Sequence, residues 1–186
     1  ILSRPIDLNT FACIYAGAQK NIGPSGLVVT VIRKDLAAKA DEKLPTMFKY
    51  STHIENGSMY NTPNTWGIYL SDLVFEWMEQ KGGLEGIARI NDAKAAKLYA
   101  AIDNSGGYYS CPVEKGSRSK MNVVWRLRNE ELDEKFIKEA KAQKMIGLKG
   151  HRAVGGIRAS IYNAVGQDAL RLHGRLPEEE RLALFR

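Results

Sequence analysis

The sequence is poor in the residues that build metal sites and disulfide frameworks. Its 186 residues include two cysteines and three histidines. Cys13 and Cys111 lie far apart and form no Cys-x-x-Cys pair, which argues against a zinc site and against a scaffold stapled by disulfides. We therefore expect no metal, and we expect both cysteines to be reduced thiols of a cytoplasmic protein.

The sequence also lacks long apolar runs and basic clusters. No stretch approaches the roughly 18 apolar residues that cross a membrane, and we expect no signal peptide. The net charge is +6 and the pI about 9.3, but the basic residues are interleaved with acidic ones. We therefore expect neither a membrane nor a nucleic acid as partner, and the excess charge suits small anionic ligands.

What the sequence has is apolar periodicity, with 44% hydrophobic residues. This predicts a protein of mixed helices and strands, with a compact α+β or α/β part from about residue 90 onward. A polar loop is expected at 53–65. Helices are expected at 66–80, 84–102 and 132–144, the last opened by Asn129, with one or two helical turns within 33–43. Strands are expected at 11–15, 27–32, 121–127, 146–148 and 157–162.

Helical spacing also predicts which side chains of the two long helices face the core. In the first helix the candidate core positions are Ile68, Leu73, Val74, Trp77 and Met78. In the second they are Ile87, Ile90, Ala93, Ala96, Leu98 and Ile102.

Lys20 lies in a turn rich in small residues, between two segments with strand patterns. Desolvation there would favour the neutral amine, which is a nucleophile for carbonyl groups and suits Schiff-base chemistry. A lysine at the solvated tip of a hairpin is the plain alternative.

Two further stretches carry candidate binding residues. GHRAVGGIRAS contains His151, Arg152 and Arg158 around a diglycine, and arginine binds carboxylate or phosphate through paired donors. Surface arginines are the alternative, but Arg158 falls inside a predicted strand and would need a partner. Asn61 and Thr62 could bind a phosphate, or they could simply belong to a loop that caps the next helix.

Five runs of the sequence match a known family in the family's own order and approximate spacing. They are IYAGAQKNIGPSGL, NGSMYNTPNTWGIYLSDLVFEWMEQKGG, INDAKAAKLYAAIDNS, RSKMNV and LKGHRAVGGIRASIYNA. Over roughly residues 1 to 165 the sequence therefore resembles the phosphoserine aminotransferases, which are fold-type I enzymes that use pyridoxal 5'-phosphate. The resemblance implies the end of the large α/β cofactor domain at 1–88 and a small α+β C-terminal domain at 89–186.

The resemblance also implies roles for individual residues. Lys20 matches the lysine that forms the Schiff base with the cofactor, and Gln19 matches a ligand of the cofactor phosphate. Asn61 and Thr62 match a pair that reaches the cofactor phosphate of the neighbouring subunit, which implies a homodimer with shared active sites. Arg158 matches the arginine that binds the substrate α-carboxylate. His151 and Arg152 match residues associated with the substrate phosphate.

The implied reaction moves an amino group between glutamate and 3-phosphohydroxypyruvate and gives phosphoserine and 2-oxoglutarate, in serine biosynthesis. The family's chains are about twice as long, and their N-terminal half carries an aspartate, an aromatic residue and a glycine loop of the cofactor site. We therefore expect this chain alone to be inactive. The alternatives are another fold-type I aminotransferase and a non-catalytic packing or oligomerisation module.

Two departures from the family pattern stand out. NTPNT replaces the more usual NTPPT, which leaves Asn61 and Thr62 intact. After about residue 165 the sequence leaves the family's single amphipathic helix, because Pro177 interrupts the pattern beyond Gly174.

Overall fold

A computed structural model describes residues 1–170 of the chain. These residues fall into two compact units that divide between Glu85 and Gly86. The unusual C-terminal run around Pro177 lies outside the described residues.

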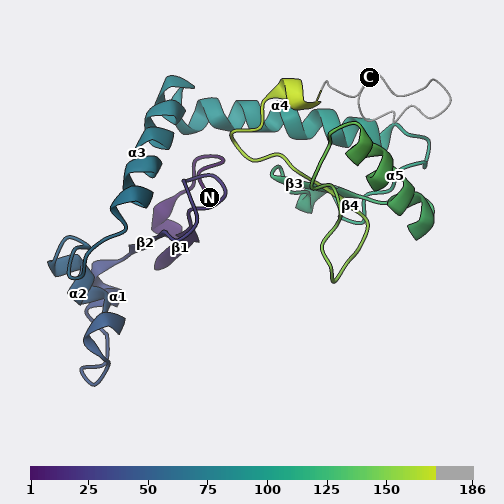
Figure 1. Cartoon of the computed structure of the whole chain (residues 1–186). Helices are drawn as coiled ribbons and strands as arrows, with labels where there is room; N and C mark the ends of the chain where they lie inside the picture. Colours follow the sequence, from purple (N-terminus) through teal and green to yellow (C-terminus); the bar gives the residue numbers. More distant parts are fainter. Residues whose placement is uncertain (171–186) are drawn as a thin grey trace. The chain divides into compact units, whose positions relative to one another are not determined.

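The first unit, Ile1–Glu85, is built on a hairpin and three helices (Figure 1). Strands β1 (Cys13–Gly17) and β2 (Val28–Ile32) pair antiparallel, with Cys13 opposite Ile32 and Gly17 opposite Val28. Helices α1 (Lys34–Ala37), α2 (Tyr50–Glu55) and α3 (Thr65–Gln80) follow. Helix α3 begins where it does because the Asn64 side chain accepts a 3.0 Å hydrogen bond from the amide of Gly67.

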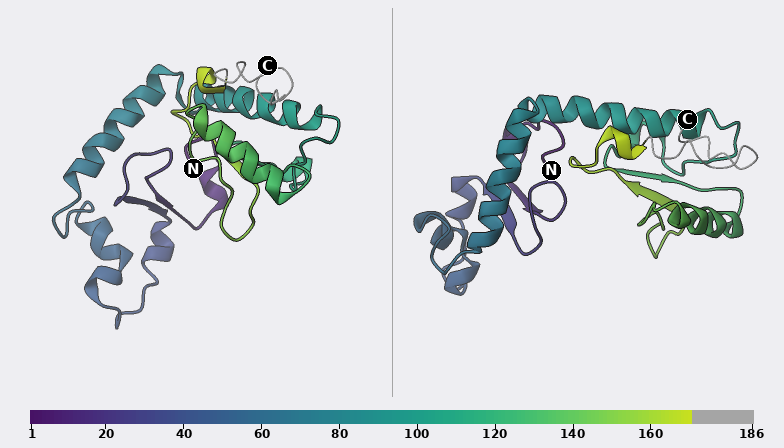
Figure 2. Two further views of the ribbon diagram at one scale, coloured as in Figure 1. Left: turned by 45° about the vertical axis from the view of Figure 1, so that its right-hand side comes forward. Right: turned by 45° about the horizontal axis from the view of Figure 1, so that its top comes forward.

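The second unit, from Gly86 onward, contains most of α4 (Gly83–Asp103), the strands β3 (Asn122–Trp125) and β4 (Ile157–Ser160), and α5 (Glu130–Ala142). The two strands pair antiparallel, and α4 and α5 both lie beside them (Figure 2). A single apolar core joins all four elements. At its centre the Trp125 ring, 1% exposed, meets the Phe136 ring edge to face at 5.9 Å.

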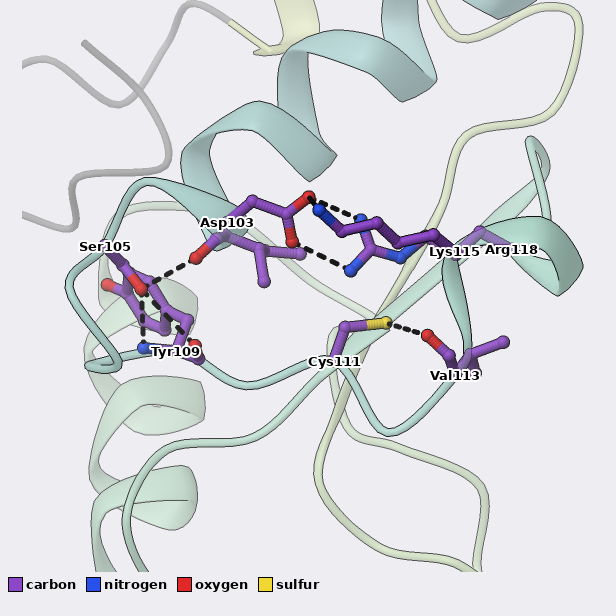
Figure 3. Close-up of polar contacts among 8 residues, drawn as sticks. Asp103, Ser105, Tyr109, Cys111, Val113, Lys115 and Arg118 are labelled. Atoms are coloured by element: carbon purple, nitrogen blue, oxygen red, sulfur yellow. Dashed lines mark hydrogen bonds and ion pairs between the residues drawn. The ribbon is translucent and has the colours of Figure 1, made fainter.

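A polar cluster fastens the 108–118 segment to the end of α4 (Figure 3). Arg118 donates two 2.8 Å hydrogen bonds to the two carboxylate oxygens of Asp103, and its guanidinium lies 4.6 Å from the centre of the Tyr99 ring. The hydrogen bond from Arg118 lowers the pKa of Asp103. Ser105 adds a local bond by accepting from the Tyr109 amide at 2.9 Å. The cluster closes one end of the core without being part of the candidate site.

The sequence predicts the long elements closely. Helices α3 and α4 and strand β2 lie within one residue of the predicted ranges. Helix α5 lies two residues earlier than predicted at both ends, with Asn129 capping it by accepting from the Leu132 amide at 2.9 Å, and β3 is shorter than the predicted 121–127. Strand β1 begins two residues later than predicted, at Cys13. The short helix expected within 33–43 is α1, of four residues.

Other predictions are wrong. The segment predicted as a loop from His53 includes the end of α2. No strand forms at 146–148, because Gly147 adopts a φ of +78° and only Lys149 makes a single bridge to Ile157. Four predicted core side chains are exposed on their helices: Ile68, Leu73, Ala93 and Ala96.

Candidate functional site

Lys20 lies in the connection between β1 and β2, as its sequence position predicts. Ala18 is fully buried and anchors this connection: its amide donates to Leu27 and its carbonyl accepts from Ile22 and Gly23, at 2.9 to 3.1 Å. The Lys20 side chain is exposed. The small neighbouring residues suggested that Lys20 would be shielded from water, but residues 1–170 of this chain do not cover its side chain. The Lys20 amine is therefore accessible to a ligand.

Gln19 is held close to the end of β1. A Cβ atom at position 17 would lie 2.5 Å from the Gln19 side-chain oxygen, so Gly17 leaves the space that this amide uses. The amide and the Lys20 amine belong to adjacent residues of one turn.

Asn61 and Thr62 lie just before α3 and are exposed. The Asn61 side chain donates to the Thr62 carbonyl at 3.2 Å. Three residues on, Asn64 donates to the Gly26 carbonyl at 3.2 Å and so ties the β1–β2 connection to the start of α3. Within the first unit, the end of the β1–β2 connection at Gly26 is thus tied to Asn64, the residue that caps α3 and follows the Asn61–Thr62 loop.

Arg158 lies on β4, opposite Val124 of β3. Its amide donates to the Leu148 carbonyl at 2.8 Å, which fixes the backbone on the other edge of the strand. The side chain is half-buried, and its Nε is buried with no hydrogen-bond partner among residues 1–170. A buried guanidinium nitrogen without an acceptor fits an anionic ligand, and a carboxylate matches its paired donors.

His151 and Arg152 occupy an exposed loop that is folded back on itself. The His151 carbonyl accepts from the amides of Val154 and Gly155 at 2.9 and 2.8 Å. The Ala153 amide donates to His151 Nδ1 at 3.2 Å, which assigns the proton of a neutral ring to Nε2. His151, Arg152 and Arg158 belong to the second unit, and Lys20, Gln19, Asn61 and Thr62 to the first.

Two basic residues near Arg158 and the His151 loop were not predicted to matter. Arg126, which follows β3, donates through Nη2 to the Val154 carbonyl and so fixes the backbone of the His151 loop. Lys94 of α4 is fully buried, and burial lowers its pKa to about 8. The sequence did contain a signal that Lys94 is buried: at helical spacing it falls on the same face of α4 as Ile87, Leu98 and Ile102.

In the part of the chain that the structure describes, no group of three or more His, Cys, Asp or Glu side chains could hold a metal ion. Over the same residues, no helix combines the length and apolar character needed to span a membrane.

Comparison with known proteins identifies the family of the chain. The family model "Aminotransferase class-V" matches residues 1–171. Phosphoserine aminotransferase from Niallia circulans is 54% identical over 165 residues, which cover 89% of this chain and 46% of that protein. The solved phosphoserine aminotransferase of Bacillus circulans subsp. alkalophilus superposes with a TM-score of 0.89 at 53% identity, over 91% of this chain and 47% of the other.

A further solved structure concerns the cofactor linkage. It is described as "Radiation damage of the Schiff base in phosphoserine aminotransferase", and it matches at 54% identity with a TM-score of 0.87, over 91% of this chain and 47% of the other. The chain thus spans about half the length of the relatives it matches. The predicted fold class, part of a fold-type I aminotransferase with mixed helices and strands, is confirmed, and the chain belongs to the class-V aminotransferase family, whose members depend on pyridoxal phosphate.

Proposed function

We propose that this chain supplies the C-terminal half of a phosphoserine aminotransferase, which moves an amino group between glutamate and 3-phosphohydroxypyruvate. The observation that carries the proposal is the buried, unpartnered Nε of Arg158 on β4, because a half-buried guanidinium is the group expected to bind an amino acid carboxylate. The identity of 54% to the Niallia circulans phosphoserine aminotransferase supports this choice of substrates.

The first unit has the residues that fit the cofactor. Lys20 would hold pyridoxal phosphate covalently through its exposed amine, and the Gln19 amide, for which Gly17 leaves room, would bind the cofactor phosphate. The bound cofactor would supply the electron sink for the substrate α-carbon. The Lys20 amine would take the proton from the substrate α-carbon as general base. Asn61 and Thr62 would bind the cofactor phosphate of the partner subunit.

The second unit has the residues that fit the substrates. Both substrates carry a carboxylate next to the reacting carbon, and Arg158 would bind it in each case. His151 and Arg152 would bind the phosphate of 3-phosphohydroxypyruvate or the distal carboxylate of glutamate. The bonds from the Val154 and Gly155 amides and from Arg126 hold the backbone of this loop, so that the two side chains can extend from it.

The proposal includes partners for this chain. We infer that the first unit is the end of a large cofactor domain, that the second is the small domain, and that activity needs an N-terminal half and a homodimer with shared active sites. The chain alone is then inactive. Both Cys13 and Cys111 are free thiols, which supports the proposed cytoplasmic location.

The test uses the 186-residue chain, alone and co-expressed with the N-terminal half of the Niallia circulans relative. Each sample is incubated with pyridoxal phosphate, reduced with borohydride and mapped by peptide mass. We expect one reduced adduct, at Lys20, in the co-expressed sample only, together with transamination of 3-phosphohydroxypyruvate by glutamate. Lys20→Arg should abolish both. Lys34→Arg, which changes another exposed lysine in the same way, should change neither.

Other outcomes separate the alternatives. Adduct formation with transfer to a different keto acid only would indicate another fold-type I aminotransferase. Stable association of the two halves without an adduct at Lys20 would indicate a packing module, and would overturn the proposal.

A further inference from the structure

Lys94 is a charged residue enclosed within the second unit. Its side chain is 0% exposed, and its ammonium donates to the carbonyls of Ile161, Tyr162 and Val165 at 3.1, 2.8 and 2.9 Å. An ammonium has three N–H donors and no acceptor, so each donor has one carbonyl. Lys94 makes no ion pair within residues 1–170. The contacts of this charge are therefore all with backbone.

The three carbonyls belong to the segment that follows directly after β4. In β4 and directly after it Ile157, Ala159 and Ile161 are buried, while Arg158, Ser160 and Tyr162 are half-buried. Lys94 therefore reaches the end of β4 from α4, on the side of the strand that carries the buried residues. Arg158 lies on the opposite face of β4, because successive side chains of a strand alternate between its two faces.

A second contact fastens the same segment to the same helix. One turn before Lys94, the Asn91 side chain donates to the Asn163 side-chain oxygen at 2.9 Å, and both residues are buried. Two buried polar side chains of α4, those of Asn91 and Lys94, therefore hydrogen-bond to the segment from Ile161 to Val165. On the other side of Arg158, the backbone is held by the bond to Leu148 and by pairing with β3.

We propose that Lys94 is a positioning residue for Arg158: its ammonium fixes the backbone beyond β4 and so holds Arg158 where it can bind the substrate carboxylate. The inference rests on the proposed function, because the role of Arg158 belongs to it. A bidentate arginine–carboxylate contact depends strongly on placement, and a displacement of about 1 Å can cost about 100-fold in rate. Without Lys94 three carbonyls lose their donor, and the buried carbonyl of Ile161 can find water only if the segment shifts.

The test compares Lys94→Met with Lys97→Met in the assembly formed with the Niallia circulans N-terminal half. Lys97 is the matched control, because it lies one turn further along α4 and donates to a single carbonyl, that of Leu170, at 3.4 Å. We expect Lys94→Met to raise KM for both glutamate and 3-phosphohydroxypyruvate by about tenfold or more. The absorbance of the bound cofactor should remain, and Lys97→Met should leave both KM values within about twofold.

A second readout does not depend on activity. Hydrogen exchange of the amides in 157–165 should become faster in Lys94→Met, including the Arg158 amide that bonds to Leu148, and should not change in Lys97→Met. If Lys94→Met does not fold, Lys94→Gln takes its place, because it keeps two N–H donors and should show a smaller effect of the same kind.

The outcomes keep this inference apart from the proposed function. Unchanged KM values in a Lys94 variant, with a lower melting temperature only, would show that Lys94 supports the core without positioning Arg158, and the inference would fail. Unchanged KM values in Arg158→Met, or an inactive wild-type assembly, would overturn the proposed function. The exchange rates at β4 would then still decide whether Lys94 holds this segment.

Discussion

The buried amine of Lys94 predicts an unusual dependence of stability on pH. Burial lowers its pKa from the usual 10.5 to about 8 in the folded chain. Between these two values the unfolded chain binds a proton that the folded chain has lost. Because stability rises with pH wherever the unfolded state binds more protons, the second unit should become more stable as the pH rises above about 8.

The size of this effect follows from the two pKa values. Each pKa unit is worth about 1.4 kcal/mol. Integrated between about pH 7.5 and about pH 9.5, the shift gives a gain of about 2 kcal/mol in the free energy of unfolding. Measurements should stop there, because burial also raises the pKa of Tyr109. A tyrosine with a raised pKa contributes stability that is lost once the unfolded chain ionises, above about pH 10.

Urea denaturation followed by the fluorescence of Trp125 is the suitable assay. This residue is 1% exposed and lies in the core of the second unit, so its emission reports the unfolding of that unit. Trp66 and Trp77 lie in α3, in the first unit, and can be changed to Phe to remove their signals. Lys94→Met should abolish the gain of about 2 kcal/mol, and Lys97→Met should keep it. Equal slopes in all three proteins would refute the reasoning.

Three further changes have defined outcomes. Phe136→Ala should lower the free energy of unfolding of the second unit by about 3–5 kcal/mol in the same fluorescence assay, because the ring is 3% exposed and packs edge to face on Trp125. Asn64→Ala should lower the stability of the first unit by about 1 kcal/mol in a circular dichroism melt of the assembly formed with the N-terminal half, because α3 loses its cap. Arg118→Met should bring the pKa of Asp103 back toward its usual range. The folded-state pKa is lowered, so the pair contributes stability at neutral pH that is lost as the pH falls through that pKa. The melting temperature of the variant should therefore fall less steeply with decreasing pH than that of the unchanged chain.

Local signals in the sequence were sufficient for the long helices. Helix α3 has a side-chain cap at Asn64 and ends before a glycine pair, and α5 has a cap at Asn129 followed by acidic residues. These features act within one turn of the chain, so they can be read without knowledge of the fold. The same holds for β2, which is rich in β-branched residues.

The role of Lys94 depends on contacts that no local pattern shows. Lysine is almost never fully buried unless it is paired, so its position on the apolar face of α4 was not assigned to the core. Its three carbonyl partners lie 67 to 71 residues further along the chain. Only the packing of α4 against the end of β4 brings them together, and this packing is set by the core as a whole.

The two units differ in how completely they bury their own apolar residues, and the difference bears on the proposed function. In the second unit Leu98, Val123, Trp125 and Ile157 are at most 1% exposed. The second unit exposes three large apolar side chains by 52 to 79%, namely Tyr108, Ile146 and Val154, whereas the first unit exposes more of them, by 49 to 77%: Leu8, Tyr15, Val28, Phe48, Met59, Tyr60, Trp66, Ile68 and Tyr69. So much apolar surface costs free energy unless it is covered, and large apolar patches mark interaction surfaces. This exposed surface, which includes the Ile68 that helical spacing predicted to be buried, supports the proposal above that the first unit packs against an N-terminal half and a partner subunit.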